Sequence, residues 1–198
     1  MDSPAKKQDI PAPRRAQILA AAAELFSRRG YHGVTVDAIA QRAGISKGNL
    51  YWYFKSKQEI FQVLFTDVVQ RMENPVLKIM ESDGTPREKL RALARSCLDN
   101  AEANPDDVYL VWQMQAQPEL QELVSSEYRL WMGPFADHMI ALFAAIGVKN
   151  PESAGMLFAI TLNALPILVV VHPGIHNKEK LMAALEESIR SFGEERDV

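Results

Sequence analysis

The first part of the chain shows three short helical patterns of apolar and polar positions. Over residues 14–29, apolar side chains recur every three or four positions and charged side chains occupy the opposite face, as in an amphipathic helix. Gly30 follows directly, and glycine commonly ends a helix. The pattern predicts a first helix over residues 14–29, with these inward positions: Ile18, Ala22, Leu25 and Phe26.

Two shorter patterns follow and predict a helix-turn-helix motif. Thr35 stands where it can cap a second helix, which Gly44 ends. Ser46 can cap a third helix, in which Leu50 and Phe54 are four residues apart and share a face. Two short helices joined by a three- to four-residue turn that contains glycine form this motif.

The third helix has an unusual outward face. At about 100° per residue, Tyr53 and Phe54 fall on the same side as Leu50 and are predicted to face the core. The opposite side combines a glycine that permits close approach, an amide that can read base edges, and aromatic residues with O–H or N–H donors. Such a face suits the major groove of DNA and its phosphates. Its members are Gly48, Asn49, Tyr51 and Trp52.

Helix start signals continue to the end of the chain. Ser56 and Thr85 each precede a Glu by three positions, which is the spacing of a capping box. Asn104 and Asn150 each precede a proline, so that a cap is followed by a residue suited to the first helical position. Stretches of alternating β-branched residues with turn dipeptides are absent from the sequence. We therefore predict an all-α chain with about nine helices.

The distribution of charge divides the chain. Its 198 residues are 47% apolar, as in a globular protein, and carry a net charge of −3. Residues 1–61 contain ten basic and five acidic residues, a net charge of +5, which leaves −8 for the rest. This asymmetry indicates a nucleic-acid-facing segment joined to one of another function. We expect a disordered tail over 1–12, a helix-turn-helix domain over 13–61, and a helical bundle over 62–198.

Cysteine usage and hydropathy predict a soluble, cytoplasmic protein. Cys97 is the single cysteine and cannot form an internal disulfide, so a reducing compartment is expected. The N-terminal residues lack the apolar stretch of a signal peptide. The apolar run over 156–171 is shorter than the roughly 20 residues that a membrane-spanning helix needs, so we expect a buried or interface helix.

The N-terminal pattern resembles the DNA-binding domain of the TetR family of transcriptional repressors. The match runs over residues 14–57, and its most specific part is 48–57, Gly-Asn-Leu-Tyr-Trp-Tyr-Phe-Lys-Ser-Lys. The resemblance implies a homodimer that binds a palindromic double-stranded DNA operator. This chain departs from the family pattern at Asn49, where a small hydroxyl residue or alanine is common, and at Trp52, where histidine is frequent.

The resemblance also implies roles for individual residues. Thr35 is expected to cap the second helix and touch a phosphate, and residues 46–49 are expected to meet base edges or the DNA backbone. Tyr51 and Trp52 are expected to bind phosphates, and Lys57 is expected to anchor the start of the fourth helix on the DNA backbone. The candidate DNA-binding residues are Thr35, Ser46, Lys47, Gly48, Asn49, Tyr51, Trp52 and Lys57.

The second part of the chain contains a dense set of large, adaptable side chains between residues 109 and 143. Such side chains are usually core, but they also permit an apolar cavity for a small molecule. The resemblance implies an effector there that moves the DNA-reading domains apart. The candidate pocket residues are Tyr109, Trp112, Met114, Tyr128, Trp131, Met132, Phe135 and Met139.

Two apolar stripes near the C-terminus are candidates for a dimer interface. The final helix, over 178–192, has an apolar stripe opposite charged residues, and the apolar helix over 156–171 precedes it. A monomer could bury both stripes internally, whereas the resemblance implies a four-helix bundle with a second copy. The candidate interface residues are Leu162, Leu165, Leu168, Leu181, Leu185 and Ile189.

Catalysis, cofactors and metals have little support in the sequence. The four histidines are scattered, and Pro173 and Gly174 break any helix that would align His172 with His176 as metal ligands. We therefore expect a regulator that requires neither cofactor nor metal. Three alternatives stay open: a DNA-binding regulator without an effector, a helical enzyme, and a redox role for Cys97 in place of structural burial.

Overall fold

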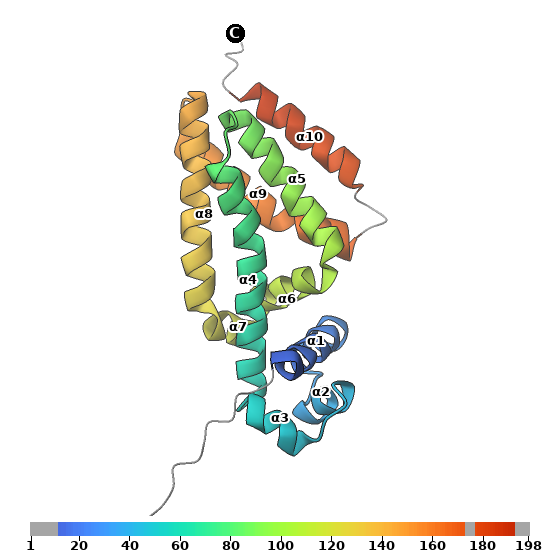
Figure 1. The fold of residues 1–198 in the computed structure, drawn as a ribbon. Coiled ribbons are helices and arrows are strands. Elements are labelled where there is room, and N and C mark those ends of the chain that lie inside the picture. Colours follow the sequence, from blue (N-terminus) through green and yellow to red (C-terminus); the bar gives the residue numbers. More distant parts are fainter. Residues whose placement is uncertain (1–11, 173–176, 193–198) are drawn as a thin grey trace, which may run out of the picture. The chain divides into compact units, whose positions relative to one another are not determined.

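The computed structural model describes residues 12–172 and 177–192, and every regular element in this range is a helix (Figure 1). The all-α prediction is confirmed, with ten helices in place of about nine. The predicted tail lies almost entirely outside the described residues. The helices are α1 (Ala12–Arg29), α2 (Val36–Arg42), α3 (Lys47–Tyr53), α4 (Lys57–Glu81), α5 (Pro86–Ala103), α6 (Pro105–Ala116), α7 (Pro118–Leu123), α8 (Ser125–Ile146), α9 (Pro151–Val171) and α10 (Lys178–Ser191).

The chain divides into two compact units, Met1–Leu64 and Phe65–Val198. Helix α4 begins in unit 1 and continues into unit 2. In unit 1, the predicted inward positions of α1 and α3 form a core with the first turns of α4. The rings of Phe26, Tyr31 and Phe61 pack together, with centroids 5.2 to 5.8 Å apart. Leu50 and Phe54 are fully buried, as predicted.

The turns of unit 1 form as the sequence predicts. Gly30 and Gly44 both adopt positive φ angles, +70° and +67°, which L side chains rarely adopt. The Thr35 hydroxyl accepts a hydrogen bond from the backbone amide of Ala38 in α2 at 3.1 Å. The Ser46 hydroxyl accepts one from the backbone amide of Asn49 in α3 at 3.2 Å. Both predicted caps are therefore confirmed, and they fix where the helices of the motif begin.

Unit 2 is built around α5, which packs against α8, α9 and α10 (Figure 1). Helices α8 and α9 approach closely at Gly155. A Cβ atom at that position would lie 2.5 Å from the backbone nitrogen of Ile140 and 2.6 Å from its Cα. Only glycine therefore fits this crossing.

The two predicted capping boxes form to different degrees. Thr85 and Glu88 form the complete box, with each backbone amide donating to the other's side chain. The Ser56 hydroxyl accepts from the amide of Glu59, but the Glu59 carboxylate accepts from the amide of Lys55 and not from that of Ser56. In the Ser56–Glu59 pair, the carboxylate thus binds the backbone amide one residue before the one that a capping box uses.

The two predicted asparagine caps also differ. The Asn150 side chain caps α9 by accepting from the amide of Ser153 at 3.2 Å. Asn104 stands at the N-cap of α6 with proline at the first helical position, as predicted, but its side chain makes no cap bond. The Asn104 amide donates instead to the backbone carbonyl of Asn100 at 3.2 Å and to its side-chain oxygen at 2.9 Å.

Helix α9 is the one helix in the described part of the chain that is long and apolar enough to cross a membrane by length and composition. Its burial explains that composition, because one face, including Phe158, Leu162 and Leu165, lies in the core of unit 2. The outward face keeps Met156, Leu157 and Ile160 exposed.

Of the six residues predicted for a dimer interface, four are buried within the protomer, and Leu168 and Leu181 are partly buried. The apolar stripe of α10 packs on α5, and that of α9 packs on α5 and α8. This placement follows the alternative in which a monomer buries both stripes itself. All six residues belong to the core of unit 2 or pack against it: Leu162, Leu165, Leu168, Leu181, Leu185 and Ile189.

Candidate functional site

The outward face of α3 is a surface of exposed glycine, amide and aromatic residues. Gly48 and Asn49 are exposed, and the exposed fractions of Tyr51 and Trp52 are 47% and 81%. Tyr53, predicted to face the core, is half-buried. Two adjacent exposed aromatic side chains form a contiguous apolar patch, which is the kind of surface that marks an interaction site.

Gly48 is not required by the fold of unit 1. A Cβ at this position would meet only the Ser46 hydroxyl at 4.0 Å, and the backbone has no positive φ angle. Glycine inside a helix costs about 1 kcal/mol relative to alanine, so the folded chain alone would favour alanine. The small residue leaves room at the surface, which is what close approach by a second molecule needs.

Lys47 is held next to this surface by Asp37. Its ammonium donates to the Asp37 carboxylate at 2.8 Å, and the hydrogen bond and the negative charge raise the pKa of Lys47. Both side chains are more than half exposed, so the ion pair stabilises the fold little and opens at low cost. Lys47 is therefore available to an anionic partner.

Lys57 bridges the start of α4 and the turn between α1 and α2. Its ammonium donates to the backbone carbonyls of Tyr31 and Val34, both at 2.9 Å, and lies 4.2 Å from the centroid of the Tyr31 ring. Partial burial lowers the pKa of Lys57. Sequence reasoning missed this structural role, and a contact between Lys57 and DNA stays a prediction.

Other polar residues of unit 1 differ in how much of their hydrogen-bonding capacity is already used within the protein. The Thr35 hydroxyl accepts the cap bond, and its O–H group keeps its donor capacity for a phosphate. Arg28 and Arg42 both pair with Glu24. Arg28 lies in the last turn of α1, where a basic residue favourably complements the helix dipole.

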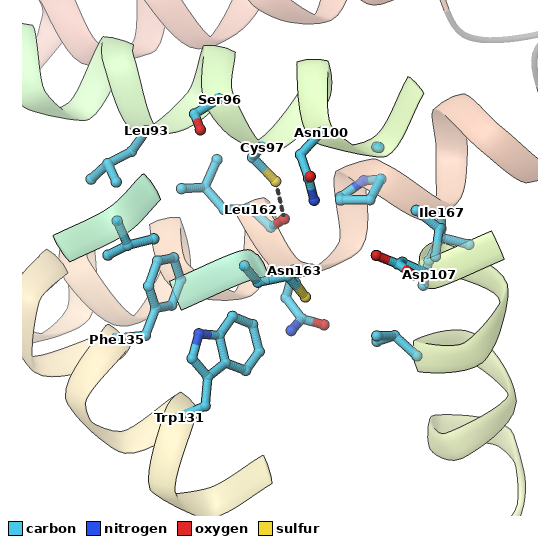
Figure 2. A pocket seen from close by; sticks show the side chains of 16 residues that line it. Leu93, Ser96, Cys97, Asn100, Asp107, Trp131, Phe135, Leu162, Asn163 and Ile167 are labelled. Atoms are coloured by element: carbon cyan, nitrogen blue, oxygen red, sulfur yellow. Dashed lines mark hydrogen bonds between the residues drawn. The ribbon is translucent and has the colours of Figure 1, made fainter. Parts of the chain in front are cut away.

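A cavity lies within unit 2, between α4, α5, α6, α8 and α9 (Figure 2). Its cavity volume is about 60 Å³, and part of it is open to solvent. This is below the roughly 300–1,000 Å³ of most small-molecule sites, so a larger ligand must displace the walls or extend toward solvent. The lining residues are Met72, Val76, Leu93, Ser96, Cys97, Asn100, Ala101, Asp107, Val108, Val111, Trp131, Phe135, Leu162, Asn163, Pro166 and Ile167.

Two of the eight predicted pocket residues line this cavity. The rings of Trp131 and Phe135 stack at its wall, with centroids 5.5 Å apart and planes 19° apart. Tyr128 and Met132 do not line the cavity but contact Asn163, which does. The Asn163 side-chain nitrogen lies 3.4 Å from the Tyr128 hydroxyl and 3.4 Å from the Met132 sulfur. These four predicted residues are thus close to one another.

The remaining four predicted residues lie away from the cavity wall. Met114 and Met139 are buried in the core, with exposed fractions of 3% and 0%. Tyr109 is half-buried and Trp112 is exposed. Adaptable side chains at helical spacing are usually core, and Met139 belongs to the main core cluster of unit 2.

Sequence reasoning missed the polar residues of the cavity. Asp107 is only 8% exposed, and Arg71 binds its carboxylate in a bidentate pair, at 2.8 Å from Nε and 2.7 Å from Nη2. Asn100 lies on α5, three residues after Cys97. The available signal was the presence of polar residues on the otherwise apolar inner face of α5.

Cys97 has a structural partner. Its thiol donates to the backbone carbonyl of Leu162 at 3.1 Å. That carbonyl lacks its usual helical donor because Pro166, four residues later, has no N–H group. Burial raises the pKa of Cys97 to about 12. The thiol therefore stays protonated at neutral pH, which argues against a redox-reactive thiolate.

Metal ligands do not gather in the described part of the chain, where no group of three His, Cys, Asp or Glu side chains could hold an ion. His172 follows α9, and His176 lies outside the described residues. The cavity of unit 2 is instead lined by apolar side chains and a few polar groups held by their neighbours, which suits it to binding a small molecule.

Comparison with known proteins places these features in a family. Residues 18–64 match the bacterial regulatory proteins of the tetR family. The HTH-type transcriptional activator FasR of Mycolicibacterium smegmatis is 35% identical over 50% of this chain and 46% of its own length. The HTH-type transcriptional repressor KstR2 of the same organism is 33% identical over 54% of this chain and 52% of its own length.

Solved structures extend the likeness to the whole fold. The transcriptional regulator FadR from Bacillus subtilis, solved in complex with stearoyl-CoA, has a TM-score of 0.73 and 22% sequence identity. The match covers 89% of this chain and 97% of that one. In sequence, the chain spans about half the length of the two curated relatives. Both relatives are named as transcriptional regulators.

Proposed function

Because this chain belongs, by its N-terminal domain, to the TetR family of bacterial regulatory proteins, we propose that it is a cytoplasmic, DNA-binding transcriptional regulator. It binds a palindromic operator as a homodimer and is released by an apolar small molecule. The observation that carries the proposal is the outward face of α3. It combines the exposed Trp52 with Gly48, which the fold does not require, and with Lys47, whose exposed ion pair with Asp37 can open at low cost.

The residues of this surface take different roles on DNA. Lys47 and Asn49, in the first turn of α3, contact base edges in the major groove, since an ammonium can donate to guanine and an amide to adenine. Gly48 lets the helix approach. Tyr51 and Trp52 donate to phosphates from their O–H and N–H groups. These contacts orient the protein on the DNA but do not discriminate between base sequences.

The dimer uses the outward face of α9. Met156, Leu157 and Ile160 are exposed large apolar side chains with helical spacing, and they lie on the side of the helix opposite the core. This stripe replaces the buried leucines of α9 and α10 as the candidate interface. A two-fold dimer presents two copies of α3 to half-sites about 34 Å apart, as a palindromic operator requires.

Release follows from ligand binding in the cavity of unit 2. A ligand shifts the equilibrium only by the difference between its affinities for the two states. The effector therefore binds more tightly to a form whose reading domains do not match the half-site spacing. The protein acts as a repressor when the occupied operator overlaps a promoter. The cavity weighs against a regulator with a fully packed second unit.

Selection of fragments bound by the full-length protein from random DNA tests the proposal. We expect a palindrome to be enriched, and Asn49→Ala to change the preferred bases within it. Arg28→Ala is the matched control, because it removes an exposed cation of unit 1 that pairs with Glu24. A failure of the wild-type protein to enrich any sequence would contradict the proposal.

Sedimentation velocity tests the dimer. Leu157→Glu together with Ile160→Glu should convert a dimer to a monomer, because two charges would be buried without partners. Ala183→Glu adds a charge at an exposed position of α10 and should leave the dimer intact. A wild-type protein that sediments as a monomer at micromolar concentration would refute the interface.

A further inference from the structure

We infer that the effector is an uncharged apolar molecule with a hydroxyl group at one end, and that Asn100 and Asp107 bind this hydroxyl. The inference rests on the proposed role of the cavity as the effector site. It goes further by naming the chemistry of the polar end, which decides between alcohols, acids and amines of similar apolar bulk.

The cavity is chemically divided (Figure 2). Leu93, Phe135 and Trp131 lie together at one side, from α5 and α8, and form an apolar wall. Asn100 and Asp107 lie at the other side, from α5 and α6, with polar atoms directed toward the space between them. A molecule that fills the cavity therefore meets apolar surface along its body and polar groups at one end.

The orientation of the Asn100 amide is fixed by its neighbour. Asn104 donates to the Asn100 side-chain oxygen at 2.9 Å and to its backbone carbonyl at 3.2 Å. The oxygen is thus turned to Asn104, and the amino group faces the cavity (Figure 2). Asn100 therefore offers a hydrogen-bond donor to a ligand, because an amide nitrogen cannot accept. Asn104, whose side chain makes no cap bond at the start of α6, has this orienting role.

The carboxylate of Asp107 is fixed as well. Arg71 holds both of its oxygens, at 2.7 and 2.8 Å, and the residue is 8% exposed. A carboxylate has about four acceptor positions, so two bonds from Arg71 leave capacity for another donor. Arg71 itself is not part of the cavity wall. Asp107 therefore offers the cavity an acceptor with negative charge.

A donor and an acceptor that line the same end of the cavity select a hydroxyl group. A hydroxyl oxygen accepts from the Asn100 amide while its hydrogen is donated to Asp107. A carboxylate has no hydrogen to donate, so its oxygens would face the acceptor oxygens of Asp107 without a bond, and an ammonium group has no lone pair for Asn100. Both protein groups are held before the ligand arrives, so little conformational entropy is lost on binding.

Calorimetric titration of the full-length, DNA-free protein tests this selection with three probes of equal chain length: 1-decanol, sodium decanoate and decylammonium chloride. We expect 1-decanol to bind at least about tenfold more tightly than decanoate, because a hydrogen bond to a charged acceptor is lost. 1-Decanol and decylammonium share a decyl tail, whereas the tail of decanoate is one carbon shorter, which alone accounts for about 0.8 kcal/mol, or about fourfold in affinity.

Two variants assign the preference to its residues. Asp107→Asn should lower the alcohol-to-acid ratio of affinities to about the fourfold that tail length alone gives, because the introduced amide can donate to decanoate. Asn100→Ala should weaken 1-decanol by about tenfold and change decanoate less. The controls are Asp106→Asn, an exposed neighbour of Asp107, and Asn74→Ala, an exposed asparagine of α4, which should leave the ratio unchanged. A ratio is insensitive to a general loss of folded protein.

The outcomes separate the inference from the proposed function. Equal or tighter binding of decanoate or decylammonium, or an alcohol preference that Asp107→Asn does not reduce, would overturn the inference and leave the regulator intact. A preference for 1-decanol that depends on both residues, without any effect of the alcohol on operator affinity, would support the inference and overturn the proposed release. Absence of binding by all three probes would also overturn the inference.

Discussion

The two units of this protein place function differently relative to the core. In unit 1, the candidate DNA-binding surface consists of the exposed side of one seven-residue helix, whose opposite side carries the buried Leu50. In unit 2, the cavity is lined by five helices, and residues such as Leu93 and Leu162 belong both to its wall and to the core. Substitutions on the surface of unit 1 should therefore change DNA affinity without loss of stability, whereas substitutions around the cavity of unit 2 should change ligand affinity and stability together.

The largest effect is expected at the crossing of α8 and α9 in unit 2. Gly155→Val would place side-chain atoms within the backbone of Ile140, so the two helices must separate. We expect the free energy of unfolding to fall by at least about 3 kcal/mol, as in a strongly overpacked core. Cavity binding should weaken as well, because both helices line it. Urea unfolding and calorimetric titration measure the two changes.

Gly133→Ala is the control for this prediction, since a Cβ at that position of α8 meets nothing within 4 Å. It should leave stability unchanged or raise it by about 0.5–1 kcal/mol through helix propensity. If Gly155→Val destabilised the protein but left ligand affinity intact, stability and function would be separable in unit 2 also.

The reverse behaviour is expected at Gly48. Gly48→Ala fills open space on α3, so we expect the free energy of unfolding to rise by about 0.5–1 kcal/mol. The added methyl group should keep α3 from approaching DNA and reduce operator affinity by about tenfold to a hundredfold, the range for loss of a base contact. Thermal unfolding and fluorescence anisotropy with labelled operator give the two numbers. Unchanged operator affinity would show that no partner approaches here.

Lys57 is the exception within unit 1, because it lies in the candidate DNA-binding set and also bridges two segments. Lys57→Ala should reduce the free energy of unfolding by about 2 kcal/mol, since the carbonyls of Tyr31 and Val34 lose a charged donor. Its affinity should fall alike for operator and for unrelated DNA. Lys55→Ala removes an exposed charge two residues away and should leave stability unchanged.

Anisotropy at a temperature where each variant is folded separates the two roles of Lys57. A loss of stability with full DNA affinity would assign Lys57 to the fold alone. Lys47→Ala completes the comparison: it should leave stability nearly unchanged, because its ion pair with Asp37 is exposed, and should change the preference between operators.

The same difference between the units explains what the sequence could predict. The caps at Thr35 and Ser46, the glycine turns, and the two sides of α3 depend on neighbours within a few residues, and all of them form as expected. The helix-turn-helix resemblance depends on the same local pattern. Local signals therefore predicted the surface of unit 1, but not the contact of Lys57 with carbonyls more than twenty residues away.

The cavity of unit 2 depends on contacts between helices far apart in sequence. Phe135 and Met139 are one turn apart on α8, yet one lines the cavity and the other is fully buried in the core. Residue type does not distinguish them, because both are large and apolar. Asp107 lies in the first turn of α6, where the local sequence explains an acidic residue by the helix dipole alone, whereas its ion pair joins it to Arg71 of α4, 36 residues away.

The smallest effect tests whether Cys97, which lines the cavity, also contributes to folding. The pKa of its thiol is raised to about 12 in the folded protein from an ordinary value of 9, so above pH 9 the unfolded chain releases this proton while the folded chain keeps it. Stability conferred by the protonated thiol is therefore present below pH 9 and is lost as the pH rises toward 12. Between pH 9 and pH 10 this loss amounts to about 1 kcal/mol.

Cys97→Ala removes the titrating group and isolates its contribution from those of the tyrosines and lysines. We expect the free energy of unfolding of the wild type to fall about 1 kcal/mol more than that of the variant between pH 9 and pH 10. At pH 7 the variant should be less stable, because the Leu162 carbonyl loses its donor, whereas Cys97→Ser should restore much of the difference. Parallel pH profiles for wild type and Cys97→Ala would mean that the thiol is accessible and ionises freely, and a cavity residue of unit 2 would then be separable from the fold.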